Sequence, residues 1–327
     1  MDYILNWYSL LACYTINYMA DANPDLSIVI LNYNVRELLL NCLDSIFKSK
    51  MQKDNWQVIV VDNASEDKSV ESVREIYRNP STTLRVDLIQ NQSNLGFSGG
   101  NNIGVKKAKA PVILFLNPDT KIVGNAIQKT YDYLMSNPDI GAITCRVELP
   151  DGKLDYSCHR GFPTPWNSFC YFLGLSKIFP HSPLFSGYTA SYLDTTKTHE
   201  IDCLTGAFLM VRKIAGEQIG FWDTDYFFNG EDIEFCYSLK EKGWKIFFYP
   251  EVKIIHYKGS SSGLKNTGVV KVDKKIRLKA ASHGISAMRI FYKKHFYKKY
   301  PPIFRDLILV GINILEYYRK VKLWISQ

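Results

Sequence analysis

The sequence lacks the motifs of several common enzyme classes. It contains no GxxxxGK[ST] motif, which excludes a P-loop nucleotide-binding domain, and no HExxH or GxSxG motif. The glycines of residues 96–104 do not form a GxGxxG fingerprint and do not follow the first predicted strand, which disfavours a dinucleotide-binding domain. Seven cysteines are scattered without a CxxC pair, so we expect neither a disulfide framework nor a zinc knuckle, and a reducing cytosol is favoured.

Long apolar runs are also missing. Spanning a bilayer takes about 20 predominantly apolar residues, and no segment reaches this length without polar interruption. Residues 1–19 have no basic start and no small-residue cleavage site, so a signal peptide is not expected. Residues 1–24 are predicted to be an N-terminal extension, with translation from Met19 as an open alternative. The apolar run at 307–315 is short and predicts an amphipathic or interfacial helix.

The net charge of +8 is concentrated at one end of the chain. Residues 265–327 contain 15 Lys or Arg and three Asp or Glu, a net charge of +12, which leaves −4 for residues 1–264. Within this tail, basic side chains interleave with aromatic ones: Arg289, Phe291, Tyr292, Lys293, Lys294, Phe296, Tyr297, Lys298 and Lys299. We predict a helical tail at an anionic membrane surface, on a cytoplasmic protein associated with the inner face of the cell membrane. Nucleic acid is the rival, less favoured partner.

Strand and helix patterns alternate through the first half of the chain. Apolar runs predict strands at 26–31, 58–61, 84–89 and 112–116, each followed by a helical pattern, the last of which includes Ile122. The alternation predicts an α/β fold with a doubly wound, mainly parallel sheet and helices on both faces. Further regular structure is expected at 203–211, in a helix at 231–243, and in strands at 245–249 and 252–255. Residues 150–200 are rich in proline and aromatic residues and predict an irregular region, which either grips a substrate or serves packing alone.

Polar clusters stand where three of these strands end. They are Asn32-Tyr33-Asn34, Asp62-Asn63 and Asn117-Pro118-Asp119. Ligands of parallel sheets bind outside the carboxyl ends of the strands. Asn and Asp also favour turns for local reasons, but three clusters on one edge favour a binding site over turns alone. Asp119, directly after a buried strand, suits a divalent cation such as Mg²⁺.

Three further residues are candidates for chemistry. Glu231 and Asp232 stand at the start of a predicted helix, where they serve either as favourable N-terminal charges or as a general base toward a substrate hydroxyl. His256 ends a predicted strand beside a Gly/Ser-rich loop, a position that suits a ligand-binding histidine as well as a packing one.

Seven segments resemble glycosyltransferase family 2, particularly its bacterial rhamnosyltransferase-like members that build cell-surface polysaccharides. In order over about residues 25–265 they are SIVILNYN, IVVDNASEDKSVE, NLGFSGGNN, LFLNPDT, DCLTGAFLMVRK, FFNGEDIEFCYSLKEKGWKI and IIHYKGSSS. The resemblance implies a GT-A fold, a nucleotide-sugar donor, a divalent metal (Mg²⁺ or Mn²⁺) and an inverting single displacement. It places the transferase domain at 25–264, with a nucleotide-binding half at 25–120 and an acceptor and catalytic half at 121–264, followed by the tail at 265–327.

The resemblance also implies roles for individual residues. Asp232 matches the catalytic base, with Glu231 as its neighbour and substitute. Asp119 matches the main metal carboxylate, and His256 resembles the histidine that meets metal or diphosphate in some relatives. Asn117 stands where many relatives have the first Asp of an Asp-x-Asp motif. The expected nucleotide-sugar-binding residues are Asn32, Tyr33, Asn34, Asp62, Asn63, Asn94, Gly96, Asn101, Asn102, Asn117, Asp119 and Gly206.

The function implied by the resemblance is transfer of a sugar to a hydroxyl of a lipid-linked or polysaccharide acceptor in cell-surface glycan synthesis. L-rhamnose from dTDP-rhamnose is the first candidate. A UDP- or GDP-hexose donor is an alternative, as is a non-catalytic sugar-nucleotide-binding or scaffold protein with the same fold.

Overall fold

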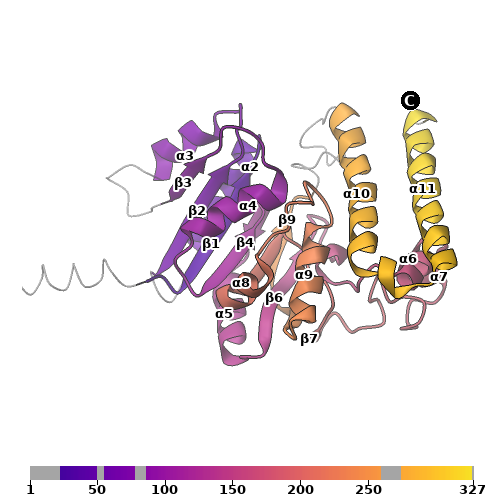
Figure 1. The fold of residues 1–327 in the computed structure, drawn as a ribbon. Helices are drawn as coiled ribbons and strands as arrows, with labels where there is room; N and C mark the ends of the chain where they lie inside the picture. Colours follow the sequence, from indigo (N-terminus) through magenta and orange to yellow (C-terminus); the bar gives the residue numbers. More distant parts are fainter. Residues whose placement is uncertain (1–22, 50–54, 78–85, 259–273, 326–327) are drawn as a thin grey trace, which may run out of the picture.

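The computed structural model describes residues 23–49, 55–77, 86–258 and 274–325 of the 327-residue chain. Its centre is a nine-stranded sheet of order β3-β2-β1-β4-β8-β6-β9-β5, with β7 paired to β9 (Figure 1). The strands are β1 (Leu26–Asn32), β2 (Trp56–Asp62), β3 (Asp87–Gln90), β4 (Val112–Leu116), β5 (Thr120–Ile122), β6 (Ile140–Glu148), β7 (His199–Glu200), β8 (Phe208–Arg212) and β9 (Lys245–His256). Almost all of the predicted N-terminal extension, and the start of the strand predicted at 84–89, lie outside the described residues.

The first four strands of the chain form the parallel half of the sheet. β1 pairs in parallel with β2 and β4, and β2 pairs in parallel with β3. β1 and β4 are buried along nearly their whole length because helices cover the sheet, which explains their continuous apolar sequences. The helices in this half are α2 (Arg36–Lys48), α3 (Ser69–Tyr77) and α4 (Gly96–Lys107).

The glycines of residues 96–104 lie within α4 and not in a loop before it. A Cβ atom on Gly100 would lie 2.3 Å from Leu31 Cδ1, and one on Gly104 would lie 2.4 Å from Val29 Cγ1. Glycine in a helix interior costs about 1 kcal/mol relative to alanine. Here it allows the helix backbone to approach β1 closely, so close packing offsets the low helix propensity.

The second half of the sheet is mixed. β8 is antiparallel to β4 and β6, β9 is parallel to β6, and β5 and β7 are antiparallel to β9. Six of the nine strands therefore run in one direction, and the predicted mostly parallel α/β sheet is confirmed.

Three predictions about this half were wrong or incomplete. β6 has no counterpart among the predicted strands. The two strands predicted at 245–249 and 252–255 are one strand, β9, in which a register shift between Tyr249 and Lys253 accommodates Pro250. Ile122 lies in β5, and the helix that follows it, α5 (Ala126–Ser136), begins later than predicted.

Short helices replace the irregular region expected at 150–200. They are η1 (Tyr156–Cys158), α6 (Pro165–Phe172) and α7 (Leu175–Ile178). Two further helices follow, α8 (Lys213–Ile219) and α9 (Glu231–Glu241). All four aromatic side chains of α6 are 43–52% exposed, although Trp166 stacks on Phe169, so substrate contact and packing both stay predictions for this region.

The C-terminal segment forms the predicted helical tail. α10 (Lys274–His295), η2 (Tyr297–Lys299) and α11 (Pro302–Ile325) form a hairpin beside α9 (Figure 1). Its core contains Ile285, Phe291 and Ile312, and Ile233 and Tyr237 of α9 pack against it. The Gly/Ser-rich loop after His256 and residues 265–273 lie outside the described residues. Within the part of the chain that is described, no helix is long and apolar enough to cross a membrane.

Candidate functional site

The ends of β1 and β2 form one polar edge. Asn32 and Asp62 stand opposite each other in the parallel register, and Asn32 Nδ2 donates a hydrogen bond of 2.8 Å to Asp62 Oδ1. The backbone N–H of Ser65 donates to Asp62 Oδ2 at 2.9 Å, and the Ser65 hydroxyl accepts from the backbone N–H of Asn34, also at 2.9 Å. Asp62 is therefore held by both oxygens, while Tyr33 beside it is 44% exposed.

Asn32 has a polar atom without a protein partner. The residue is fully buried, and among the described residues its Oδ1 accepts no hydrogen bond. A buried acceptor left unpaired costs about 1–3 kcal/mol, so such atoms in native proteins usually meet water or a ligand.

Asn63, Asn94 and Gly96 connect the end of β2 to the start of α4. Asn63 Nδ2 donates to Asn94 Oδ1 at 3.2 Å and to the Gly96 carbonyl at 3.0 Å. Gly96 has a φ of +74°, and a Cβ atom there would lie 2.5 Å from the Phe227 carbonyl oxygen. Packing against the backbone of Phe227 therefore requires glycine at this position.

Asn101, Asn102 and Gly206 also make packing contacts. Asn101 Nδ2 donates to the Phe97 carbonyl in its own helix at 3.0 Å. Asn102 pairs twice with the backbone of Trp222, donating to its carbonyl at 2.7 Å and accepting from its N–H at 3.1 Å. A Cβ on Gly206 would lie 2.9 Å from the ring of Phe97. Nucleotide or acceptor contact by these three residues stays a prediction.

Asp119, His256 and Asp155 form a buried chain of side chains. Thr120 of β5 pairs with His256 of β9, which brings Asp119 next to the imidazole. His256 Nε2 lies 3.2 Å from Asp119 Oδ1, and His256 Nδ1 lies 3.1 Å from Asp155 Oδ2. Lys258 Nζ donates to the other oxygen of Asp155 at 2.6 Å. Asn117 lies at the same edge, where its backbone N–H donates to the Ala207 carbonyl at 3.1 Å.

The charges of this chain shift its pKa values. Burial lowers the pKa of His256, but Asp119 and Asp155 outweigh burial and raise it to about 9. Burial raises the pKa of Asp155, but hydrogen bonding to His256 and the charge of Lys258 leave that pKa well below its usual range. The two acidic neighbours therefore favour the protonated form of the imidazole.

The donor set fits a divalent metal held jointly with a substrate. Mg²⁺ usually takes one or two carboxylates and completes its shell with water and substrate phosphates. A metal-ligating histidine usually donates its other ring N–H to a carboxylate, which is the position of Asp155 relative to His256. Among the described residues, no group of three or more His, Cys, Asp or Glu side chains forms a metal site on its own. Because the pKa of His256 is raised and a metal binds the neutral imidazole, metal binding here would displace a proton.

Asp232 is paired with Arg160. Arg160 Nη2 lies 2.5 Å from Asp232 Oδ2, and each side chain is only 14% exposed. The backbone N–H of Ile233 donates to the other carboxylate oxygen at 2.8 Å. Both Asp232 oxygens are therefore oriented at the start of α9.

Glu231 differs from its neighbour. It is buried, and its Oε2 atom has no hydrogen-bond partner within the described ranges. Burial, together with the charge of Asp232, raises the pKa of Glu231 to about 8. Glu231 therefore holds its proton more tightly than an ordinary glutamic acid does.

One short segment connects the two candidate centres. Asp155 caps η1 by accepting a hydrogen bond of 3.0 Å from the backbone N–H of Ser157, and Arg160 Nε donates to the Ser157 carbonyl at 3.0 Å. Residues 155–160 thus hold His256 at one end and Asp232 at the other. The sequence does not single out Asp155 or Arg160. The Asp-x-Ser spacing is a local capping signal, but the partners lie 101 and 72 residues away.

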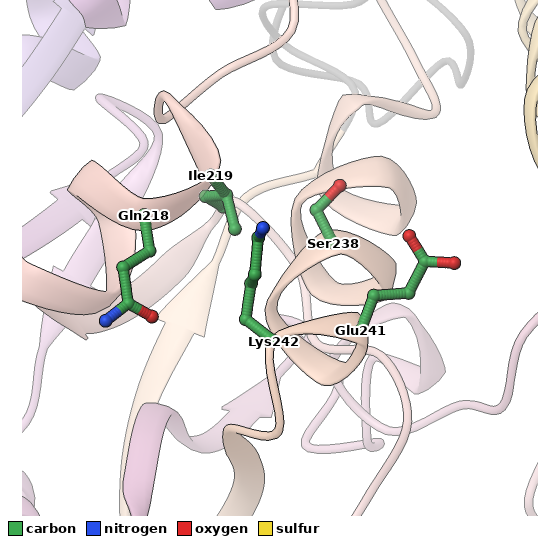
Figure 2. Close-up of a pocket in the computed structure, with 5 residues that line it drawn as sticks. All are labelled: Gln218, Ile219, Ser238, Glu241 and Lys242. Carbon is green, nitrogen blue, oxygen red and sulfur yellow. The ribbon is translucent and has the colours of Figure 1, made fainter.

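A cavity of about 610 Å³ lies elsewhere, between the end of α8 and the C-terminal half of α9. It is lined by Gln218, Ile219, Ser238, Glu241 and Lys242, and Figure 2 shows Lys242 reaching between the two helices. None of the predicted site residues lines it. The polar strand edge, and not this cavity, is therefore the candidate site.

Residues 27–196 match the model of the family described as Glycosyl transferase family 2. The chain belongs to this family. The predictions of a family 2 member and of a glycosyltransferase are therefore confirmed.

Two curated proteins are similar to this chain. The chain is 25% identical over 217 residues to the N-acetylglucosaminyl-diphospho-decaprenol L-rhamnosyltransferase of Mycobacterium tuberculosis (strain ATCC 25618 / H37Rv), covering 63% of this chain and 68% of that protein. It is 24% identical over 241 residues to the poly-beta-1,6-N-acetyl-D-glucosamine synthase of Staphylococcus aureus (strain COL). This second match covers 72% of the chain and spans about half of the synthase (52%).

Solved structures confirm the fold. The mannosyltransferase PcManGT from Pyrobaculum calidifontis, in complex with GDP-Man and Mn²⁺, aligns with a TM-score of 0.55 and 16% identity over 89% of this chain and 70% of that one. GalNAc-T7 with UDP, GalNAc and Mn²⁺ aligns with a TM-score of 0.55 and 15% identity over 90% of this chain and 55% of that one. The predicted GT-A fold is therefore confirmed for this family 2 chain.

Proposed function

We propose that the protein transfers a sugar from a nucleoside diphosphate to a hydroxyl of a lipid-linked or polysaccharide acceptor in cell-surface glycan synthesis, with inversion at the anomeric carbon. The observation that carries the proposal is the segment 155–160, which positions the Asp119–His256 pair and Asp232 around one edge of the sheet. The names of the two curated relatives, a rhamnosyltransferase and a polysaccharide synthase, support this acceptor class. L-rhamnose from dTDP-rhamnose is the first donor to test.

The edge formed by β1 and β2 is proposed to bind the nucleotide base. Asn32 Oδ1 is a buried acceptor with no donor among the described residues, and thymine or uracil offers a ring N–H that would reach it once the side chains covering it shift. Tyr33 is exposed beside it and can lie against the face of a base. Asp62 orients the Asn32 amide through the 2.8 Å hydrogen bond.

Asp119 and His256 are proposed to hold Mg²⁺ or Mn²⁺ at the diphosphate, with Asp155 orienting the imidazole. A divalent metal, when bound, stabilises the negative charge that develops on the leaving diphosphate. Manganese in both solved neighbours supports a divalent ion.

Asp232 is proposed as the general base that removes the proton of the acceptor hydroxyl. Such a group contributes typically about 10²–10⁴-fold to the rate. Arg160 acts through Asp232 as a positioning residue, because its guanidinium holds one carboxylate oxygen at 2.5 Å. The other carboxylate oxygen accepts a hydrogen bond from the Ile233 N–H. The raised pKa of Glu231 favours Asp232 over Glu231 for the base role.

The proposal is tested with the purified full-length chain. A thermal-shift screen against dTDP-L-rhamnose, UDP-hexoses and GDP-mannose, each with Mg²⁺ or Mn²⁺, identifies the donor. Transfer to a detergent-solubilised polyprenyl-diphosphate sugar is then followed by mass spectrometry, and NMR of the product gives the anomeric configuration. Inversion is expected. Stabilisation by no nucleotide sugar, or binding without transfer to any acceptor, would contradict the proposed activity.

A further inference from the structure

The aromatic residues expected at a membrane surface are mostly buried. Phe291, Tyr292 and Phe296 pack within the hairpin core. Lys294, from the same cluster, forms ion pairs with Asp223 and Asp225. These four side chains therefore attach the hairpin to the transferase domain, whereas Lys293 between them is exposed.

A different face of the hairpin is apolar and uncovered. Seven large side chains of α11 are 51–72% exposed: Ile303, Phe304, Leu307, Val310, Ile314, Tyr317 and Tyr318. Steps of three or four residues connect most of them, and the adjacent pairs 303–304 and 317–318 widen the same side of the helix. Ile308, Leu309, Ile312 and Leu315, on the other side, belong to the cluster formed with α10. Both faces of α11 are therefore apolar, but only one of them is covered by the described chain.

We propose that the exposed face of α11 docks onto an anionic phospholipid bilayer, with the helix lying in the interface plane. This inference rests on the proposed function, because an acceptor carried by a membrane lipid requires the enzyme to work at the membrane surface. The uncovered stripe extends from Ile303 to Tyr318, about 22 Å at 1.5 Å per residue. Helices of this kind bury their apolar face in the headgroup region without spanning the bilayer.

Charge favours a bilayer over a second copy of the chain. Residues 285–327 contain nine Lys or Arg and two Asp or Glu, a net charge of +7. Lys293 and Lys298 are exposed near the turn that leads into α11. Two such hairpins packed face to face would repel each other, whereas each basic residue near an anionic leaflet contributes about 1 kcal/mol of attraction.

The hairpin is fixed to the helix that carries the proposed base. His295 Nε2 lies 2.8 Å from Glu234 Oε2, an oxygen that also accepts a 2.8 Å hydrogen bond from the Tyr226 hydroxyl. A Cβ on Gly230, the residue before α9, would lie 2.7 Å from the Ala287 Cβ. Docking through α11 would therefore also set the orientation of Asp232 relative to the membrane.

Vesicle flotation of the full-length protein tests the inference. The probes are vesicles of phosphatidylcholine with 30% phosphatidylglycerol, and vesicles of phosphatidylcholine alone. The variant Leu307→Glu/Ile314→Glu places two charges in the stripe. The matched control Ile76→Glu/Ile214→Glu changes two exposed apolar residues on α3 and α8. We expect the stripe variant to lose at least about tenfold in partitioning to anionic vesicles, with an unchanged melting temperature, and the control to bind like the wild type.

Three results would overturn the inference. They are equal flotation of the stripe variant and the wild type, equal binding to neutral and anionic vesicles, or a wild-type dimer that the stripe variant converts to a monomer in light scattering. Transfer to a detergent-solubilised acceptor separates this inference from the proposed function. If only the docking inference is wrong, every variant still transfers the sugar to the detergent-solubilised acceptor. If only the proposed function is wrong, no variant transfers the sugar, but vesicle binding persists.

Discussion

Arg160 and Asp232 form an ion pair of 2.5 Å in which each side chain is only 14% exposed. Removing two charges from water costs free energy that their attraction repays only in part, so such a pair adds little net stability. What it provides is geometry, since the guanidinium fixes the orientation of the carboxylate at the start of α9. Loss of either partner leaves a largely buried charge unpaired.

For Arg160→Met we expect a loss of about 3–5 kcal/mol in the free energy of unfolding, because Asp232 then lacks its cationic partner. Urea denaturation measures this loss. A double-mutant cycle with Asp232→Asn should show strong coupling. Additive effects in that cycle would argue against the pair as a unit.

Asp232→Asn is expected to lower kcat by about 10²–10⁴-fold, because the amide cannot accept the proton of the acceptor hydroxyl. Donor binding should persist, since the nucleotide edge at Asn32 and Asp62 is untouched. Steady-state transfer and calorimetric titration with the donor separate the two properties. Wild-type turnover in this variant would remove Asp232 from the base role.

Glu231 gives a prediction for stability against pH. Its pKa is raised from 4.5 to about 8 in the folded state, so the folded protein binds the extra proton between these values. The wild-type free energy of unfolding therefore falls as pH rises through this window, while Glu231→Gln lacks this loss. Relative to wild type, the variant should gain stability on the order of a few kcal/mol by pH 8 and little at pH 4.5.

Chemical denaturation at several pH values between 4.5 and 8 measures this difference. Glu241→Gln, an exposed position on the same helix, is the matched control and should follow the wild-type curve. Parallel curves for Glu231→Gln and wild type would show that Glu231 holds no extra proton in the folded state.

Asp155→Asn tests the support of the proposed metal pair. Loss of the carboxylate at His256 Nδ1 is expected to weaken Mn²⁺ binding about 10–100-fold, because the imidazole loses its orienting partner. Calorimetric titration with Mn²⁺ in the presence of a nucleoside diphosphate measures this without requiring turnover. Asp151→Asn, four residues earlier and exposed, is the control. Unchanged affinity in Asp155→Asn would show that His256 needs no such partner for binding metal.

The variants Gly96→Ala and Gly124→Ala distinguish the stability cost of a positive φ from the stability cost of a close contact. Both glycines have positive φ, +74° and +60°, but a Cβ at Gly124 meets nothing within 4 Å, whereas one at Gly96 would lie 2.5 Å from the Phe227 carbonyl. We expect Gly124→Ala to cost about 1–2 kcal/mol and Gly96→Ala to cost about 1–3 kcal/mol more. Urea denaturation checks both. Equal losses would mean that the Phe227 segment moves away freely.

Much of the first half of the fold follows from local patterns. β1, β2 and β4 are continuous apolar runs that end in polar residues, and parallel pairing brings those ends together, as Asn32 and Asp62 show. β6 was harder to predict because it contains Gly141. Glycine is required at this position by a residue outside the strand. A Cβ there would lie 2.7 Å from Trp244.

The partners of the proposed catalytic and metal residues could not be predicted in the same way. Asp155 and Arg160 resemble loop residues in the sequence, and their roles depend on contacts with His256 and Asp232 more than 70 residues away. Conversely, Asn102 matches a family motif, yet its side chain pairs with the backbone of Trp222. A motif specifies a residue type, while the packed structure decides what that residue touches.

The polar ends of the strands, the excess of positive charge in the tail and the amphipathic pattern of α11 are properties of the sequence, because composition and periodicity are local. Tertiary structure decided that Phe291 is buried while Ile314 is exposed, and that Arg160 meets Asp232. Periodicity shows that a helix has an apolar face, but whether another element covers that face depends on how distant segments pack. In this protein, that packing places the proposed catalytic base and the uncovered face of α11 on elements that are fixed to each other.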